Sequence, residues 1–231
     1  MREARIKAEG AGYYHIMSRA IEGRFIFGTA EKEFFRNLMR KLETFCGVRI
    51  VTYSILSSHW HILLDVPERQ DIDEKELLKR IRALYGGMKA EMVAEDLKKL
   101  RENGEHAAAE RVKRSYTYRM YDLSEFCKCL KQRFSQHYNK KRDRCGPLWT
   151  QRFKSVLVEN SVDALLTMAA YIDLNAVRAG LAQDPKDYRW CGYGEALGGS
   201  PRARPMKYGQ WNGLSTMRDL RKAVILVPVA G

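Results

Sequence analysis

Alternating apolar and polar residues predict three strands in the first third of the chain. These cover residues 13–20, 48–56 and 59–66, and Pro67 ends the last of them. Ser57-Ser58 separates the second strand from the third and predicts a tight reversal or a bulge between them. The first two strands are too far apart in sequence for a direct hairpin, so an element of another kind is expected between them.

That element is a helix, because large apolar residues recur at helical spacing from Phe34 to Phe45. Thr29 is the expected N-cap, with Glu31 and Glu33 placed favourably against the helix dipole, and Gly47 is the expected end. A strand, a helix and a strand pair form half of a ferredoxin-like split β-α-β sheet.

Residues 68–121 have a different character, with Glu, Lys and Arg alternating around short apolar stretches. Helices are expected near 77–84, 88–100 and 105–113, and the whole segment is interpreted as a solvated helical insertion. A surface that binds nucleic acid or a partner protein is the alternative interpretation of the same charges.

The core pattern returns after residue 122. An amphipathic helix is expected over 123–138, a fourth strand over 152–159, and a last helix that Ser161 caps and that runs to Gly180. One stripe of this last helix is apolar and is expected to pack on the sheet: Ala164, Met168, Ile172 and Ala176. The order β-α-β-β-insertion-α-β-α predicts an α+β fold with helices on one face of the sheet, a helical insertion and a C-terminal helix that carries Tyr171.

The corresponding domain boundaries are 1–67 and 122–195 for the two halves of the core, 68–121 for the insertion and 196–231 for a linker and tail. The apolar run 224–229 within the tail is interpreted as a short strand or a docking segment.

Charge gives the first indication of a partner. The 231 residues carry a formal net charge of +13, which favours a polyanion whose bound counterions are released on contact. A generally basic soluble protein is the plain alternative. The sequence contains no apolar run approaching the ~20 residues that span a bilayer and no secretory signal at its start, and its five scattered cysteines fit reduced thiols. A cytoplasmic, nucleoid-associated protein is therefore expected, with no membrane partner.

Candidate chemistry begins with His59 and His61. Residues i and i+2 of a strand point to one face, so both imidazoles can bind one metal ion while Trp60 faces the other way. Leu63 stands where a histidine-triad phosphotransferase would need its third histidine. Asp65 remains open as the further ligand of a hydrolytic zinc site, and the pair together with an oxygen ligand also suits Mg²⁺ or Mn²⁺.

Tyr171 and Asn175 lie one turn apart on the last predicted helix and share a face. The amide of Asn175 is the candidate third metal ligand, and the phenol of Tyr171 is the candidate nucleophile. A free phenol, with a pKa of about 10, is a poor nucleophile at neutral pH, so a metal that polarises a phosphate would help it. A packing or rim tyrosine is the structural alternative.

Between residues 131 and 154 the chain is strongly basic, with aromatic residues interleaved. Cations for phosphates and rings for bases suit a single strand of DNA or RNA, whereas a solvated helix end followed by a hairpin is the alternative. His15 is expected to support the first strand rather than bind metal, and His106 and His137 have no evident partners. The candidate nucleic-acid contacts are Arg19, Arg133, Lys140, Lys141, Arg142, Arg144, Trp149, Arg152, Lys154 and Arg178.

Five stretches resemble the single-tyrosine transposases of the IS200 type, which are HUH nucleases, and more closely the branch associated with repetitive extragenic palindromes (REP). They are YYHIMSRA at 13–20, SSHWHILL at 57–64, GPLWTQRFKSVLVE at 146–159, YIDLNAVRAG at 171–180 and DYRWCGY at 187–193. The resemblance implies an HUH-type sheet, metal ligands at His59, His61 and Asn175, and Tyr171 as the nucleophile.

The reaction implied by this resemblance is cleavage of single-stranded DNA near a hairpin through a 5′-phosphotyrosine, with Mg²⁺ or Mn²⁺ and without a nucleotide cofactor. Two departures are visible: Asn175 is followed by Ala176 where the family has proline, which would let the helix run on, and the insertion is long. A monomer is favoured over a dimer. The alternatives are a domesticated hairpin-binding protein that does not cut DNA and an RNA-binding ferredoxin-like module.

Overall fold

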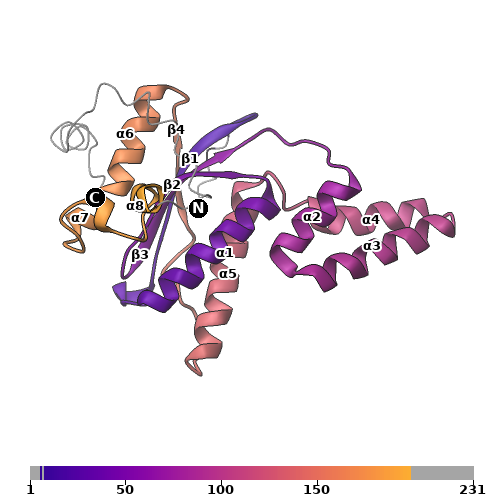
Figure 1. Cartoon of the computed structure of the whole chain (residues 1–231), viewed down its shortest axis with the longest axis horizontal. Coiled ribbons are helices and arrows are strands. Elements are labelled where there is room, and N and C mark those ends of the chain that lie inside the picture. Colours follow the sequence, from indigo (N-terminus) through magenta and orange to yellow (C-terminus); the bar gives the residue numbers. More distant parts are fainter. Residues whose placement is uncertain (1–5, 7, 199–231) are drawn as a thin grey trace, which may run out of the picture.

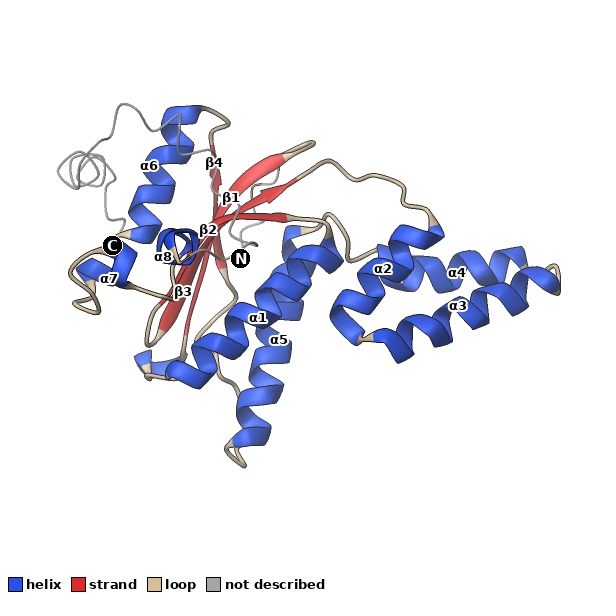
Figure 2. Cartoon of the chain, in the orientation of Figure 1, coloured by secondary structure: helices blue, strands red, loops and turns tan. Residues whose placement is uncertain are grey.

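A four-stranded antiparallel sheet organises the molecule (Figures 1 and 2). This computed structural model describes residue 6 and residues 8–198, so the predicted strand at 224–229 lies outside the described part. The strand order is β2-β3-β1-β4, which confirms the ferredoxin-like arrangement expected from the sequence. The strands are β1 (Gly12–Arg19), β2 (Arg49–Ile55), β3 (His59–Val66) and β4 (Lys154–Val158).

Two long helices, α1 (Thr29–Cys46) and α5 (Leu123–Lys141), pack together on one face of the sheet. Large apolar side chains from both helices, among them Phe35 and Phe134, meet Ile16, Trp60 and Ile62 in the main core. Because residues alternate between the faces of a strand, the histidines on either side of Trp60 lie on the opposite face.

The two ends of α1 have different caps. Gly28, not Thr29, is the N-cap, and no side chain caps this end of the helix. Gly47 ends α1 in the left-handed region with φ 66°, as the sequence predicted, and a Cβ there would collide with the guanidinium of Arg80.

The predicted insertion forms three helices that extend away from the sheet (Figure 1). They are α2 (Glu74–Tyr85), α3 (Gly87–Glu102) and α4 (His106–Thr117). Within the insertion, Arg80 donates hydrogen bonds to Glu76 and to the Tyr121 hydroxyl. The contacts with the core are made by the Tyr121 amide, which donates to the Cys46 carbonyl at the end of α1, and by α2, which packs against α1. The insertion is therefore anchored at its base through α2.

Helix α6 (Val162–Asp173) covers the other face of the sheet, and Ser161 caps it by accepting a hydrogen bond from the Ala164 amide. The predicted continuous helix to Gly180 is wrong: α6 ends at Leu174, and a short helix, α7 (Asn175–Arg178), follows. The side-chain amide of Asn175 donates to the Tyr171 carbonyl at 2.9 Å, the acceptor that the Asn175 backbone N–H would use in a continuous helix. Ile172 thus stays on the sheet, whereas Ala176 packs in a separate small cluster.

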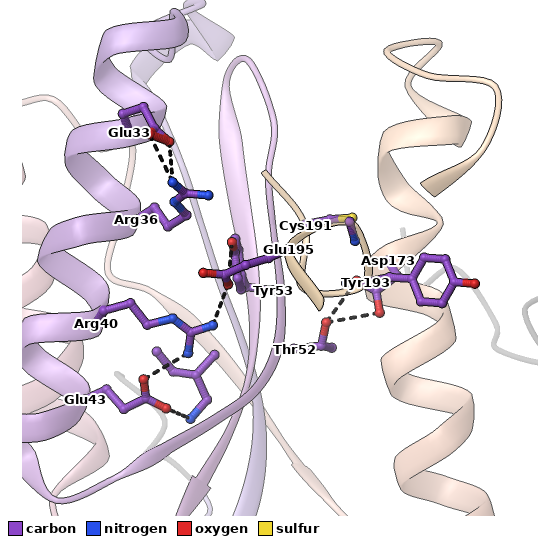
Figure 3. Close-up of polar contacts among 12 residues, drawn as sticks. Glu33, Arg36, Arg40, Glu43, Thr52, Tyr53, Asp173, Cys191, Tyr193 and Glu195 are labelled. Carbon is purple, nitrogen blue, oxygen red and sulfur yellow. Dashed lines mark hydrogen bonds and ion pairs between the residues drawn. The ribbon is translucent and has the colours of Figure 1, made fainter. Parts of the chain in front are cut away.

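The last described segment closes the β2 edge of the sheet between α1 and α6 (Figure 3). The Ile55 amide donates to the Trp190 carbonyl, and α8 (Gly192–Leu197) places Glu195 within 2.6 Å of Arg40 and 2.9 Å of the Tyr53 hydroxyl. Covering an edge in this way satisfies backbone groups that a bare edge strand would leave open. Short 3₁₀ turns occupy Ile21–Gly23 and Pro185–Asp187.

None of the five cysteines, which all lie in the described part of the chain, forms a disulfide. No helix in this part of the chain is long and apolar enough to cross a membrane.

Candidate active site

The four residues singled out for catalysis line one cavity of about 480 Å³ on the α6 face of the sheet. His59 and His61 come from β3, Tyr171 from α6 and Asn175 from the start of α7. The remaining lining residues come from the end of β1 and from the segment leading into β4: Met17, Ser18, Arg19, Thr150, Gln151, Arg152 and Lys154. The sheet therefore gathers the predicted metal ligands, the predicted nucleophile and several cations around one space.

Each of the two candidate metal-binding histidines has its Nδ1 atom engaged. The Ser58 hydroxyl lies 3.0 Å from His59 Nδ1, and His15 Nε2 lies 2.9 Å from His61 Nδ1. Nε2 is thereby left as the ring nitrogen available for a ligand on both histidines. Such partners behind the ligands fix the orientation of an imidazole that binds metal.

All three imidazoles at this site favour the neutral form. Burial, followed by the positive charge of Arg19, lowers the pKa of His59 to about 4, and burial lowers the pKa of His15 to about 4 as well. Burial is also the largest cause that depresses the pKa of His61, and the neighbouring histidines and arginines add to it. Neutral imidazoles are the form that binds metal, so the site is prepared for a cation without first losing protons.

Tyr171 stands over the histidines. Its ring contacts both His15 and His61 edge to face, with ring centroids 5.9 Å and 6.2 Å away. The guanidinium of Arg178, about two helical turns beyond the nucleophile candidate, lies 5.2 Å from the centre of the Tyr171 ring. A phosphate placed against the phenol would thus meet imidazoles on one side and a cation on the other.

The available ligand atoms fit a divalent cation that is bound partly by the protein and partly by oxygen atoms of its substrate. Among residues 8–198, no group of three or more His, Cys, Asp or Glu side chains is arranged to hold a metal ion. Asp65 lies at the far end of β3 and pairs with Arg49, so it does not complete a zinc site with the histidines. Two imidazole nitrogens and the Oδ1 atom of Asn175, whose amide nitrogen is already engaged by the Tyr171 carbonyl, remain as candidate ligands.

The predicted nucleic-acid contacts fall into two groups. Arg19, Arg152 and Lys154 line the cavity, and Arg178 lies beside Tyr171. The others lie on α5 or just after it. Most of their side chains already have partners within the chain, whereas Lys140 is exposed and contacts are given for its backbone carbonyl alone. Lys141 and Arg142 both contact Glu31, Arg144 donates to Asn139 and to the Pro147 carbonyl, and Arg133 stacks over Tyr85.

Trp149 is partly buried at the edge of the main core. Its indole nitrogen donates to the Ser135 hydroxyl at 2.8 Å, and its ring lies among Phe27, Trp60 and Phe134. Part of the residue therefore packs against the core, and its contact with a base stays a prediction.

Sequence reasoning missed three residues that hold the site together. His15 was assigned to strand support, yet it contacts His61 directly. Ser58 was read only as a turn residue, although its hydroxyl contacts His59. Asp173, between Tyr171 and Asn175, is buried and accepts hydrogen bonds from Thr52 and the Tyr193 amide (Figure 3). The signal that could have found them is their position inside three of the family-like stretches: His15 in YYHIMSRA, Ser58 in SSHWHILL and Asp173 in YIDLNAVRAG.

Comparison with known proteins relates the first part of this chain to a described family. Residues 10–107 match the family model described as IS200-like transposase, which confirms over that region the resemblance seen in the sequence. The matched part holds β1, α1, β2, β3 and the His59–His61 pair, and it ends within α4, before Tyr171. Over residues 10–107 the chain is therefore similar to IS200-like transposases.

A solved structure is similar to this chain over a longer stretch than the family model covers. A solved structure of a REP-associated tyrosine transposase bound to a REP hairpin is 16% identical to this chain. The similarity covers 88% of this chain and 90% of that one, with a TM-score of 0.55, so the same fold extends through α5, β4 and α6. No curated protein matches the chain.

Proposed function

We propose that this protein is a metal-dependent enzyme that nicks and rejoins single-stranded DNA next to hairpins through a 5′-phosphotyrosine. One observation carries the proposal: His59, His61, Tyr171 and Asn175 line a single cavity together with three cations. Each residue is of the type needed at its place, because imidazole and amide atoms bind a divalent cation and a phenol is a suitable nucleophile for a phosphodiester.

His59, His61 and Asn175 would hold Mg²⁺ or Mn²⁺, which when bound polarises the scissile phosphate and offsets its charge. Tyr171 would attack phosphorus with its phenolic oxygen after losing the phenolic proton. The new bond joins that oxygen to phosphorus, and the bond broken is the one to the 3′ oxygen, which leaves as a free 3′-OH. Reversal by another 3′-OH rejoins strands, so the energy of the broken bond is conserved and no nucleotide cofactor is required.

The proposed substrate is based on the positive charges at the cavity and on the DNA bound by the similar solved structure. Arg19, Arg152 and Lys154 at the cavity would contact phosphates on either side of the scissile bond, and Arg178 would meet the one against Tyr171. The related transposase is bound to a REP hairpin, and a DNA hairpin with a single-stranded flank is accordingly the proposed substrate here.

A monomer is the proposed working form. Tyr171 contacts His15 and His61 of its own chain, so one chain carries every candidate catalytic residue. Light scattering of the purified protein, with and without hairpin DNA, tests this directly, and a dimer with exchanged tyrosine helices would overturn it.

The decisive experiment uses a pool of labelled hairpins with single-stranded flanks, incubated with Mn²⁺ and resolved on a denaturing gel. We expect a protease-sensitive shifted band that Tyr171→Phe abolishes. Tyr13→Phe is the matched control, because Tyr13 is also partly buried against the same apolar cluster and lies in β1. An adduct that survives Tyr171→Phe would exclude this nucleophile, whereas hairpin binding without any adduct would indicate a DNA-binding protein that does not cut.

A further inference from the structure

We propose that His15 is a positioning residue that prepares His61 for metal by accepting a hydrogen bond from the His61 Nδ1–H group. The inference rests on the proposed function, since it concerns the metal expected there. His15 lies on β1 and His61 on the adjacent β3, where Met17 is the direct cross-strand partner of His61, so the two imidazoles meet diagonally on the α6 face. Both are 4% exposed, and the nitrogens are 2.9 Å apart.

The position of one proton decides whether this pair can serve a metal site. Two neutral imidazoles joined through His15 Nε2 and His61 Nδ1 share a single proton between these atoms. If His15 keeps that proton, His61 carries its own proton on Nε2 and cannot offer a lone pair to a cation. If His61 keeps the proton on Nδ1, its Nε2 lone pair is available, and His15 must be the acceptor.

His15 is held so that it can only take this role through Nε2. Its ring is nearly parallel to that of His61, with an interplanar angle of 17° and centroids 5.2 Å apart, and the edge of Tyr171 packs against it. Ser58, which contacts His59, differs in kind, because a hydroxyl rotates and can either donate or accept. The Ser58 hydroxyl can adapt to either tautomer of His59. The tautomer of His61, in contrast, depends on whether residue 15 accepts or donates a hydrogen bond.

A series at position 15 separates hydrogen-bond acceptance from packing. His15→Gln retains an acceptor at similar reach, His15→Met fills the space without a strong acceptor, and His15→Lys offers only donors. With Mn²⁺ alone as the probe in titration calorimetry, we expect Gln to stay within a few-fold of the wild type. We expect Met to weaken binding about 10–100-fold, the range for lost partners of metal-binding histidines, and Lys to weaken it at least as much.

Nuclear magnetic resonance on the wild-type protein gives a readout that packing alone does not change. In the Mg²⁺-bound protein, long-range ¹H–¹⁵N correlations should show His61 protonated at Nδ1 and not at Nε2. Protonation at Nε2 in that state would overturn the proposal, and this measurement does not require any variant to fold.

His137→Met is the matched control, because His137 lies on α5, where its ring stacks on Phe34 away from the cavity. Melting temperatures of all variants report on folding. If His15→Met binds Mn²⁺ as the wild type does while His59→Ala does not, the proposal for His15 fails and the metal site stands. If His59→Ala also binds Mn²⁺ like the wild type, the proposed metal site fails, and this inference fails with it.

Discussion

The two faces of strand β3 differ in how they accommodate their side chains. On the face toward α1 and α5, Trp60, Ile62 and Leu64 are completely buried among apolar neighbours. On the face toward α6, His59 and His61 line the cavity, and only Leu63 joins an apolar cluster. Because side chains alternate along the strand, adjacent residues of β3 belong in turn to the apolar core and to the candidate active site.

The buried polar side-chain groups of β3 itself also differ between its two faces. The Trp60 indole nitrogen is buried and has no hydrogen-bond partner within the described residues, so packing outweighs a lost hydrogen bond on that face. On the other face His61 meets His15, and His59 meets Ser58. The apolar face is stabilised mainly by buried contact area, whereas the side chains of the other face are held by particular hydrogen-bond partners. Substitutions on the apolar face should therefore lower stability, and substitutions on the other face should mainly affect ligand binding.

The largest expected effect comes from removing the anchor of the apolar face. Trp60→Ala should lower the free energy of unfolding by about 3–5 kcal/mol, the usual cost of emptying an aromatic site in a core. His59→Ala on the same strand should lower it by less than about 1 kcal/mol, because His59 is only partly buried and the hydrogen bond that its side chain loses is the one to Ser58. Urea unfolding of both variants measures this difference.

Equal losses in the two variants would show that the faces of β3 contribute alike to stability, and the comparison would then be wrong. Mn²⁺ binding supplies the converse test, since His59→Ala should lose it while remaining folded.

Element order could be predicted from local periodicity, whereas the gathering of His59, His61, Tyr171 and Asn175 in one site was implied by the resemblance to IS200-type transposases. Strand spacing of two and helix spacing of four place each pair on one face, and the sheet order brings the pairs together. Their chemical roles remain predictions that the geometry supports.

Features that depend on contacts between distant residues could not be predicted. The end of α6 at Leu174 depends on a side-chain amide that competes for the Tyr171 carbonyl. The hydrogen bond from the partly buried Trp149 to Ser135 joins residues 14 positions apart, and the pairing of Lys141 with Glu31 joins residues 110 positions apart. The His15–His61 contact follows from the register of β1 on β3, which periodicity alone does not fix.

An intermediate effect is expected at Asp173, the buried carboxyl at the end of α6. Burial raises its pKa from 3.8 to about 7, against opposing hydrogen bonds from the Tyr193 amide and Thr52. Because the folded protein binds this proton more tightly than the unfolded chain, its contribution to stability is full below pH 3.8 and is lost as pH rises through 7. The stability of the wild type relative to Asp173→Asn should fall by about 2 kcal/mol between pH 5 and pH 7.

Urea titrations of both proteins at several pH values provide the measurement. His15, His59 and His61, whose pKa values are lowered, favour folding as pH rises, but they are present in both proteins and cancel in the difference. Asp163→Asn is the control, an exposed carboxyl in the first turn of the same helix. A difference that does not change with pH would mean that Asp173 is ionised throughout this range.

The smallest effect concerns cations at the rim of the catalytic face. Arg152→Gln should reduce the slope of log binding constant against log salt concentration by about one, because Arg152 lines the cavity and one phosphate contact is lost. Lys141→Gln removes the same charge, but Lys141 already pairs with Glu31, so its slope should change by less than about half as much. Fluorescence anisotropy of a labelled hairpin over a range of salt concentrations distinguishes the two variants. Equal changes in slope would mean that overall charge, and not position at the cavity, governs DNA binding. The proposed contacts between the cations of the cavity and DNA phosphates would then be wrong.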